Sequence, residues 1–228
     1  MERTETRRMP AVHQYLMNLY ILMRENRRVV GTRLAERMGV SPPAVTQALR
    51  RLQRLGLVER GPNGEVRLTE EGRRRAEAIM RRHFLIERLL VDVLGYDWVL
   101  ADREASLLEH ALSPELEAFL YERLGRPQTC PHGNPFPGSP EEPARVQAPS
   151  LANVPPGSRV RLLRVVETAE EDLDLMRFLQ EHRLLPGAEV TVQGVEEDRL
   201  RLEGPTGTVE MPLPYARPVR VAPLKGEV

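Results

Sequence analysis

The chain has 228 residues, and 41% of them are hydrophobic, which is enough to bury a core in one large or two smaller domains. No segment approaches the roughly 18 apolar residues of a membrane span, and the N-terminus lacks the apolar core of a signal peptide. We therefore expect a folded cytoplasmic protein with no membrane partner. The net charge is zero, but residues 1–90 hold 19 basic and 10 acidic side chains, and the remainder holds 14 and 23. This asymmetry suggests an anion-binding module joined to a second part.

The first part of the chain has the pattern of three helices. Apolar residues recur every three or four positions over 12–23, which predicts an amphipathic helix. Residues 32–38 predict a second, short helix that ends at Gly39, a residue suited to the left-handed cap position. Ser41 is a preferred N-cap and Pro42 fits the first position of a third helix. A helix, a glycine turn and a capped helix together indicate a helix-turn-helix.

Two short alternating segments, 56–60 and 65–69, flank a polar turn and predict a β-hairpin, the wing of a winged helix. Helical patterns follow over 70–94 and 102–124. The tract 125–156 is rich in Pro and Gly, and we interpret it as an irregular linker.

The last part of the chain alternates as strands at 158–165, 188–192 and 199–202, with one short helix around 173–181. This pattern predicts a small β-rich domain, and a barrel would accommodate it.

The third helix has the side chains that a DNA-recognition helix needs. Short polar or small residues at its start would reach base edges, and nearby cations would hold phosphates. The candidate base-contacting residues are Ser41, Ala44, Thr46 and Gln47, and the candidate phosphate-contacting residues are Arg50, Arg51 and Arg54. Pro43 is a further candidate DNA-binding residue. Gln47 has the amide that pairs with adenine. The alternative is a winged helix that binds another protein, which the basic charge of this half disfavours.

Two polar clusters interrupt the apolar stripes of the later helices. His83 and Glu87 lie at i and i+4 on the side of the 70–94 helix that should be buried, where ionisable groups are costly unless satisfied. A second stripe mixes carboxylate and imidazole side chains: Asp102, Ser106, Glu109 and His110. Such clusters suit a divalent cation. A structural salt bridge is the alternative reading of a single His–Glu pair.

The single cysteine, Cys130, excludes an internal disulfide and leaves a packing residue, a reactive thiol or a metal ligand. Its neighbour His132 favours a metal ligand set. A cysteine hydrolase that uses Cys130 and His132, or a metal hydrolase that uses His83, is the competing enzymatic reading. We expect no enzyme, because the cysteine lies in a Pro-rich segment without a nucleophile elbow or an oxyanion motif.

Five motifs make the chain resemble the diphtheria toxin repressor family of iron- and manganese-dependent regulators, manganese transport regulators included. They occur in the third helix, in the two later helical patterns, in the Pro-rich tract and before the last strands. The motifs are Ser41–Gln47, Arg82–Leu90, Glu104–His110, Cys130–Gly138 and Leu185–Gly187.

The resemblance implies a mainly α fold with a small β domain. The expected domains are an N-terminal winged helix-turn-helix (1–72), a helical metal-binding and dimerisation domain (73–140), a linker (141–150) and a C-terminal SH3-like (FeoA-type) β-barrel (151–228). It further implies a homodimer that binds double-stranded operator DNA when a divalent transition metal is bound. Such a regulator, most simply a repressor, would control metal-homeostasis genes.

The resemblance also implies a set of metal ligands. His83, Glu87, Glu109 and His110 match family ligands. Cys130, His132 and Asp172 match an additional site that shares Glu87. The chain departs from the family pattern at Gln14, Ser106 and Asp102, where the family has stronger or different ligands.

These departures weaken the usual primary site, so the additional site should bind metal more tightly. The resemblance implies manganese or iron, whereas a Cys-His-carboxylate set also suits zinc and cobalt. The rival interpretation is a winged-helix regulator of the same fold whose DNA binding is independent of metal.

Overall fold

The computed structural model describes residues 9–25 and 28–224, and its contacts divide the chain into two compact units, 1–82 and 83–228. The division falls within one long helix, α5 (Glu70–Arg88). The finer domain boundaries expected from the sequence stay a prediction.

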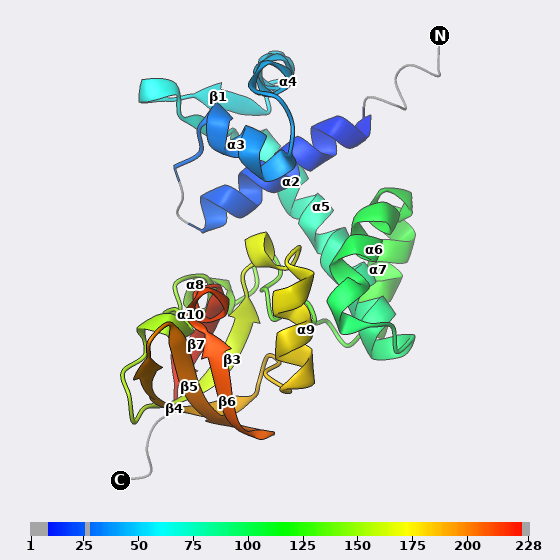
Figure 1. The fold of residues 1–228 in the computed structure, drawn as a ribbon. Coiled ribbons are helices and arrows are strands. Elements are labelled where there is room, and N and C mark those ends of the chain that lie inside the picture. Colours follow the sequence, from blue (N-terminus) through cyan, green and yellow to red (C-terminus); the bar gives the residue numbers. More distant parts are fainter. Residues whose placement is uncertain (1–8, 26–27, 225–228) are drawn as a thin grey trace. The chain divides into compact units, whose positions relative to one another are not determined.

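The first unit is a helix-turn-helix followed by a β-hairpin (Figure 1). Its elements are α2 (Met9–Arg24), α3 (Gly31–Met38), α4 (Pro42–Arg54), β1 (Val58–Arg60) and β2 (Val66–Leu68). Leucines from all three helices form its core, among them Leu16, Leu34 and Leu49, each at most 2% exposed. The predicted winged helix-turn-helix is therefore confirmed.

The turn between α3 and α4 is formed by the two helix caps predicted from the sequence, Gly39 and Ser41. Gly39 has a φ of 61°, the left-handed conformation that ends a helix at little cost for glycine. The Ser41 hydroxyl accepts a hydrogen bond from the Ala44 N–H and so satisfies one of the free donors at the start of α4. In the hairpin, Val58 pairs with Leu68 and Arg60 pairs with Val66.

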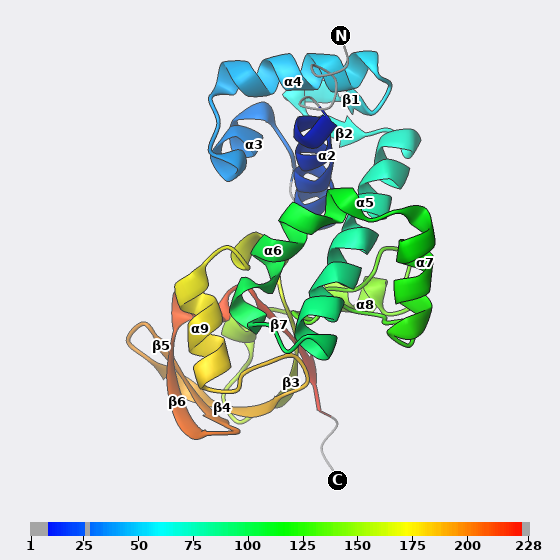
Figure 2. The same cartoon turned by 90° about the vertical axis from the view of Figure 1, so that its right-hand side faces the viewer.

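The second unit begins with the last turns of α5 and continues through short helices (Figure 2). These are the π-helix η2 (Leu89–Val93), the 3₁₀ turn η3 (Trp98–Leu100), α6 (Ala101–Leu108), the 3₁₀ turn η4 (Glu109–Ala111) and α7 (Pro114–Arg123). The helical pattern predicted over 102–124 is broken because Ser113 caps a new helix that starts at Pro114. No helix among residues 9–25 and 28–224 is both long and apolar enough to cross a membrane.

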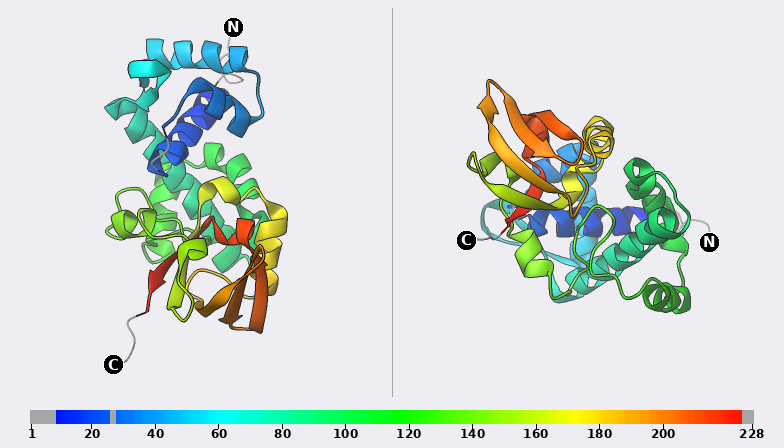
Figure 3. Two further views of the ribbon diagram at one scale, coloured as in Figure 1. Left: turned by 60° about the vertical axis from the view of Figure 1, so that its left-hand side comes forward. Right: turned by 90° about the horizontal axis from the view of Figure 1, so that it is seen from below.

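The C-terminal part of this unit is a twisted five-stranded antiparallel sheet (Figure 3). Its order is β6 (Gly207–Pro212), β5 (Arg199–Gly204), β4 (Glu189–Glu196), β3 (Arg159–Val165) and β7 (Val219–Pro223). The sequence predicted β3, β4 and β5 but missed β6 and β7. The helix α9 (Leu173–Glu181) buries Leu175, Met176 and Leu179 in the same core as the sheet, and Trp98 of η3 joins that core.

The prediction that 125–156 is an irregular linker is wrong for its central part. Residues 130–137 are buried, a short helix α8 (Glu142–Val146) follows, and the Val165 N–H donates to the His132 carbonyl over 3.0 Å. We name residues 129–138 the ligand loop. Because β3 supplies a partner for its backbone, the loop can be buried at a position where a flexible linker could not.

Gly133 shows how closely the ligand loop approaches β3. Its φ is +86°, and a Cβ atom there would lie 2.0 Å from the Leu163 carbonyl oxygen. Gly138, in the same loop, has a φ of +76° but open space around the position of a Cβ. Gly133→Ala should therefore lower the free energy of unfolding by about 2–4 kcal/mol, from the left-handed backbone and the clash together.

The matched variant Gly138→Ala should cost only about 1–2 kcal/mol, because it has the backbone penalty alone. Thermal and urea unfolding of both variants measure the difference. Equal losses in the two variants would contradict the close packing of the loop against β3.

Candidate metal centre

The structure gathers three carboxylate side chains around His83, and we name the four residues the first centre: His83, Glu87, Asp102 and Glu109. His83 Nδ1 lies 2.8 Å from Glu109 Oε2, and His83 Nε2 lies 3.2 Å from Glu87 Oε1 and 3.1 Å from Asp102 Oδ1. Both ring nitrogens therefore have carboxylate partners. The i, i+4 spacing on α5 brings His83 and Glu87 to one face, as predicted from the sequence.

The first centre holds three carboxylates against the single imidazole of His83. Burial opposes protonation of His83, but hydrogen bonds to Asp102, Glu109 and Glu87 outweigh it and raise the pKa of His83 well above its usual value. A protonated His83 can donate from both nitrogens to these carboxylates. In this state both ring nitrogens donate within the centre, and a metal that binds His83 would have to displace a proton from the imidazolium.

A second centre shares Glu87 and consists of Glu87, Cys130, His132 and Glu170. Glu87 comes from α5, Cys130 and His132 come from the ligand loop, and Glu170 follows η6 (Glu167–Ala169). His132 Nδ1 lies 3.4 Å from Glu87 Oε1 and 3.5 Å from Glu170 Oε2. Donor atoms of Glu87, Cys130 and His132 all lie within 4.8 Å of one another, and all four side chains are buried.

Two buried atoms of the second centre that could bind a metal lack a hydrogen bond. They are Glu87 Oε2 and His132 Nδ1. His132 is held in place by its other nitrogen, because Nε2 donates to the Trp98 carbonyl over 2.8 Å. This contact orients the ring so that Nδ1 faces the carboxylates of Glu87 and Glu170, and a metal could bind Nδ1 once its proton is lost. Orphaned buried donors next to a thiol fit a divalent transition metal.

Burial and the close approach of charged groups shift the pKa values of the second centre. Burial opposes the charge of His132, but Glu170 and Glu87 raise its pKa to about 10. Burial and the same two carboxylates raise the pKa of the Cys130 thiol well above its usual value. Glu87 has the opposite shift: despite its burial, His132 and His83 lower its pKa. A bound cation would replace the protons on His132 and Cys130, so raising the pH should favour its binding.

The ligand loop is fixed to α5 by Arg88, the residue after Glu87. Its guanidinium donates to the Thr129 carbonyl over 2.7 Å, to the Thr129 hydroxyl over 3.0 Å and to the Cys130 carbonyl over 3.1 Å. The indole N–H of Trp98 donates to the Pro131 carbonyl over 3.1 Å. The thiol and the imidazole are therefore held on rigid elements, as a preorganised ligand set requires.

Not every residue expected as a ligand joins these two clusters. Asp172 is exposed, and its carboxylate caps α9 by accepting from the Leu175 N–H over 3.1 Å. His110 is partly exposed, with Nε2 3.6 Å from Glu109 Oε1. Ser106 is half-buried on α6, and Gln14 is exposed on α2 in the first unit.

Glu170, two residues before Asp172, is the carboxylate of this stretch that lies beside His132. Both lie in an acidic stretch with Glu167 and Glu171, where the sequence does not show which carboxylate faces inward. One signal was available. Asp172 directly precedes a helical pattern and is a preferred N-cap, so its carboxylate was already needed by the backbone.

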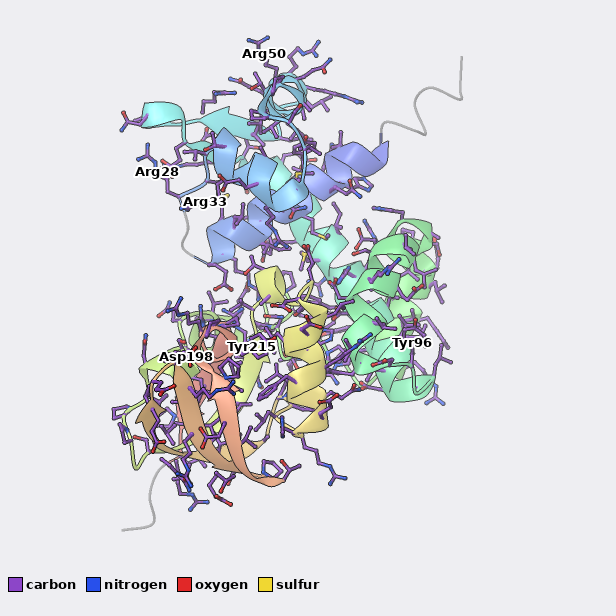
Figure 4. All side chains as sticks on the ribbon, in the orientation of Figure 1. Arg28, Arg33, Arg50, Tyr96, Asp198 and Tyr215 are labelled. Atoms are coloured by element: carbon purple, nitrogen blue, oxygen red, sulfur yellow. The ribbon has the colours of Figure 1, made fainter. Side chains whose placement is uncertain are left out.

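The candidate DNA-binding residues share the outer face of α4. Val45, Leu49 and Leu52 face the core, and most of the predicted DNA-contacting residues are exposed: Ser41, Pro43, Ala44, Thr46, Gln47 and Arg50. Arg51 is half-buried. Arg50 projects from α4 away from α2 (Figure 4). The geometry leaves this face free for a nucleic acid, although Thr46 also donates to the Pro42 carbonyl over 3.0 Å.

Two family descriptions match the chain. "Iron dependent repressor, N-terminal DNA binding domain" matches residues 9–66, and "Iron dependent repressor, metal binding and dimerisation domain" matches residues 69–138. The iron-dependent repressor IdeR of Mycobacterium leprae is 37% identical over 188 residues, which cover 78% of this chain and 82% of that protein. The diphtheria toxin repressor of Corynebacterium glutamicum is 34% identical over 222 residues, or 93% and 96% of the two chains.

Solved structures give the same result. A manganese-dependent transcriptional repressor in complex with manganese is 32% identical, with a TM-score of 0.81, and the match covers 93% of this chain and all of that one. The repressor ScaR with bound Zn²⁺ is 26% identical, with a TM-score of 0.76 and coverage of 93% and 99%. The family resemblance expected from the sequence is thereby confirmed, and this chain belongs to the iron-dependent repressor family of metal-dependent transcriptional regulators.

Proposed function

We propose that this repressor senses a divalent transition metal chiefly through the second centre, Glu87, Cys130, His132 and Glu170. The observation that carries the proposal is that two buried potential ligand atoms, Glu87 Oε2 and His132 Nδ1, have no hydrogen bond. In the first centre both nitrogens of His83 have carboxylate partners within hydrogen-bond distance, whereas His132 Nδ1 of the second centre has no hydrogen bond.

The ligand types favour a borderline-soft ion. A thiolate, an imidazole and two carboxylates suit Zn²⁺ and Co²⁺, and Mn²⁺ or Fe²⁺ would bind the same donors less tightly. The matching family is described as iron-dependent, and matching structures include a manganese-dependent repressor with manganese and ScaR with bound Zn²⁺. We propose that the cellular supply of each metal, in addition to affinity, decides which one acts on this protein.

Cys130 acts in this proposal as a ligand and not as a nucleophile. Its buried thiol has a raised pKa beside two carboxylates, the reverse of the electropositive surroundings that activate a catalytic cysteine. His132 Nε2 is already bound to the Trp98 carbonyl. We therefore propose a regulator without catalytic activity, which works in the cytoplasm on double-stranded operator DNA.

Dimerisation is supported by an apolar surface on the helical part of the second unit. Of the ten large hydrophobic side chains that are exposed within residues 12–25 and 28–224, seven lie between residues 93 and 119. Leu107 is 68% exposed, Leu94 is 65% exposed and Phe119 is 62% exposed. Tyr96 belongs to the same stretch (Figure 4). Apolar exposure of this extent marks an interaction surface, and a second copy of the chain would cover it.

The two centres are separated by paired variants in calorimetric titration with Zn²⁺ or Co²⁺. Cys130→Ala should weaken the tighter binding event more than about 100-fold, because it removes an anionic ligand. His110→Ala, at a residue whose Nε2 lies 3.6 Å from Glu109 Oε1 of the first centre, should leave that event unchanged. Loss of the tighter event in His110→Ala and its survival in Cys130→Ala would show instead that a site at Glu109 and His110 dominates.

Operator binding tests whether metal at the second centre controls DNA binding, by comparison of wild type with Cys130→Ala. Wild-type protein should bind a labelled operator when metal is added back after chelation, and Cys130→Ala should need much more metal. Equal operator affinity with chelator and with metal would favour the metal-independent regulator.

On the DNA side, Gln47→Ala should relax discrimination at one base pair of each half-site, with a loss of about 1–3 kcal/mol on the specific operator. Arg50→Ala should weaken binding to all sequences and reduce the salt slope by about one. Gln53→Ala, an exposed glutamine near the end of α4, is the matched control. Fluorescence anisotropy on specific and random duplexes measures these effects, and equal loss on both duplexes for Gln47→Ala would refute the base contact.

A further inference from the structure

Asn134 is a buried amide whose orientation is forced by its neighbours. Arg164 Nη1 donates to Asn134 Oδ1 over 2.9 Å, and Asn134 Nδ2 donates to the Val165 carbonyl over 2.8 Å. An arginine can only donate and a carbonyl can only accept. The oxygen of Asn134 must therefore face Arg164, and its NH₂ group must face the other way.

The second N–H of this NH₂ group points at the second centre. Asn134 Nδ2 donates to Glu170 Oε1, while the other oxygen, Oε2, is the one 3.5 Å from His132 Nδ1. One oxygen of Glu170 is thus engaged by the amide, and one is directed at the ligand set. Asn134 and Glu170 are both at most 2% exposed, so no solvent competes for either contact.

Arg164 is itself locked. It is 1% exposed, its Nη1 lies 3.3 Å from Glu167 Oε2, and it donates to the carbonyls of Arg145 (3.0 Å) and Val146 (3.3 Å). A buried charge held by several acceptors is costly to displace, so Arg164 is a rigid support for the amide.

We propose that Asn134, oriented by Arg164, is a positioning residue that restricts Glu170 to one metal-binding oxygen and so sets the metal preference of the second centre. This inference rests on the function proposed above. A carboxylate that binds through one oxygen gives a four-coordinate site with Glu87, Cys130 and His132, the geometry that Zn²⁺ and Co²⁺ adopt readily. A carboxylate free to bind through both oxygens would suit larger ions with more ligands, such as Mn²⁺ or Cd²⁺.

The test uses full-length protein loaded with Co²⁺, whose visible absorption is intense in four-coordinate sites and weak in six-coordinate ones. Wild type should show intense bands together with a thiolate-to-cobalt band. Asn134→Ala should keep the thiolate band and lose visible intensity. Its Zn²⁺ affinity should fall about 10- to 100-fold, and its preference for Zn²⁺ over Mn²⁺ should fall about tenfold. Asn153→Ala, an exposed amide in the same unit, should match wild type.

A double-mutant cycle separates positioning from a general loss of stability. In a Glu170→Ala background, replacing Asn134 should change neither the spectrum nor the metal preference, because no carboxylate is left to position. Unfolding in chelator confirms that each variant is folded. If Asn134→Ala does not fold, Asn134→Ser replaces it, since the serine hydroxyl is too short to reach Glu170.

The outcomes distinguish this inference from the function on which it rests. A wild type without a thiolate-to-cobalt band would overturn both. A wild-type band, with an unchanged spectrum and metal preference in the Asn134 variant, would overturn the positioning role alone. An effect of the Asn134 substitution that persists without Glu170 would also overturn it.

Discussion

The buried carboxylate of Glu87 is the constraint on which the metal-binding part of the structure depends. Its Oε1 lies 3.2 Å from His83 Nε2 and 3.4 Å from His132 Nδ1, and its Oε2 has no hydrogen bond. A charge that is fully removed from water must be compensated by nearby cations or donors. The two histidines provide part of this compensation, and a divalent cation at the second centre would complete it. The position of Glu87 on α5 thus determines where both centres form.

The second centre joins segments that are far apart in the sequence. Glu87 lies near the end of α5, Cys130 and His132 lie in the ligand loop, and Glu170 lies between β3 and α9. Arg88 binds the loop to α5, while β3 and Arg164 bind it from the other side. A metal at this point would therefore stabilise contacts between the helices and the sheet. Ligand binding that favours one arrangement of such elements is how a metal can change the population of a DNA-binding state.

Local physical rules predicted the helix-turn-helix from the sequence, because the caps at Gly39 and Ser41 and the apolar periodicity depend only on neighbouring residues. The strands β6 and β7 were missed because each is short and bounded by proline, and tertiary pairing with β5 and β3 decides their conformation. The ligand loop was misread because its burial depends on partners such as Leu163 and Arg164, more than 25 residues away.

Part of the candidate site was predictable from the sequence, and part was not. Spacing on one helix brought His83 and Glu87 together, and the Cys130–His132 pair was recognisable as a ligand motif. The fourth member, Glu170, could not be chosen among neighbouring carboxylates, since a 3₁₀ turn decides which of them is buried. The supporting residues Asn134 and Arg164 have no sequence signature, because their role is defined by contacts alone.

The central claim is that the thiol of Cys130 binds the sensed metal, and X-ray absorption spectroscopy tests it most directly. Full-length protein loaded with one equivalent of Zn²⁺ should show one sulfur neighbour at about 2.3 Å and nitrogen or oxygen neighbours at about 2.0–2.2 Å. The sulfur shell should disappear in Cys130→Ala and persist in His110→Ala. A wild-type spectrum with nitrogen and oxygen neighbours only would contradict the claim and would place the first equivalent of metal outside the second centre.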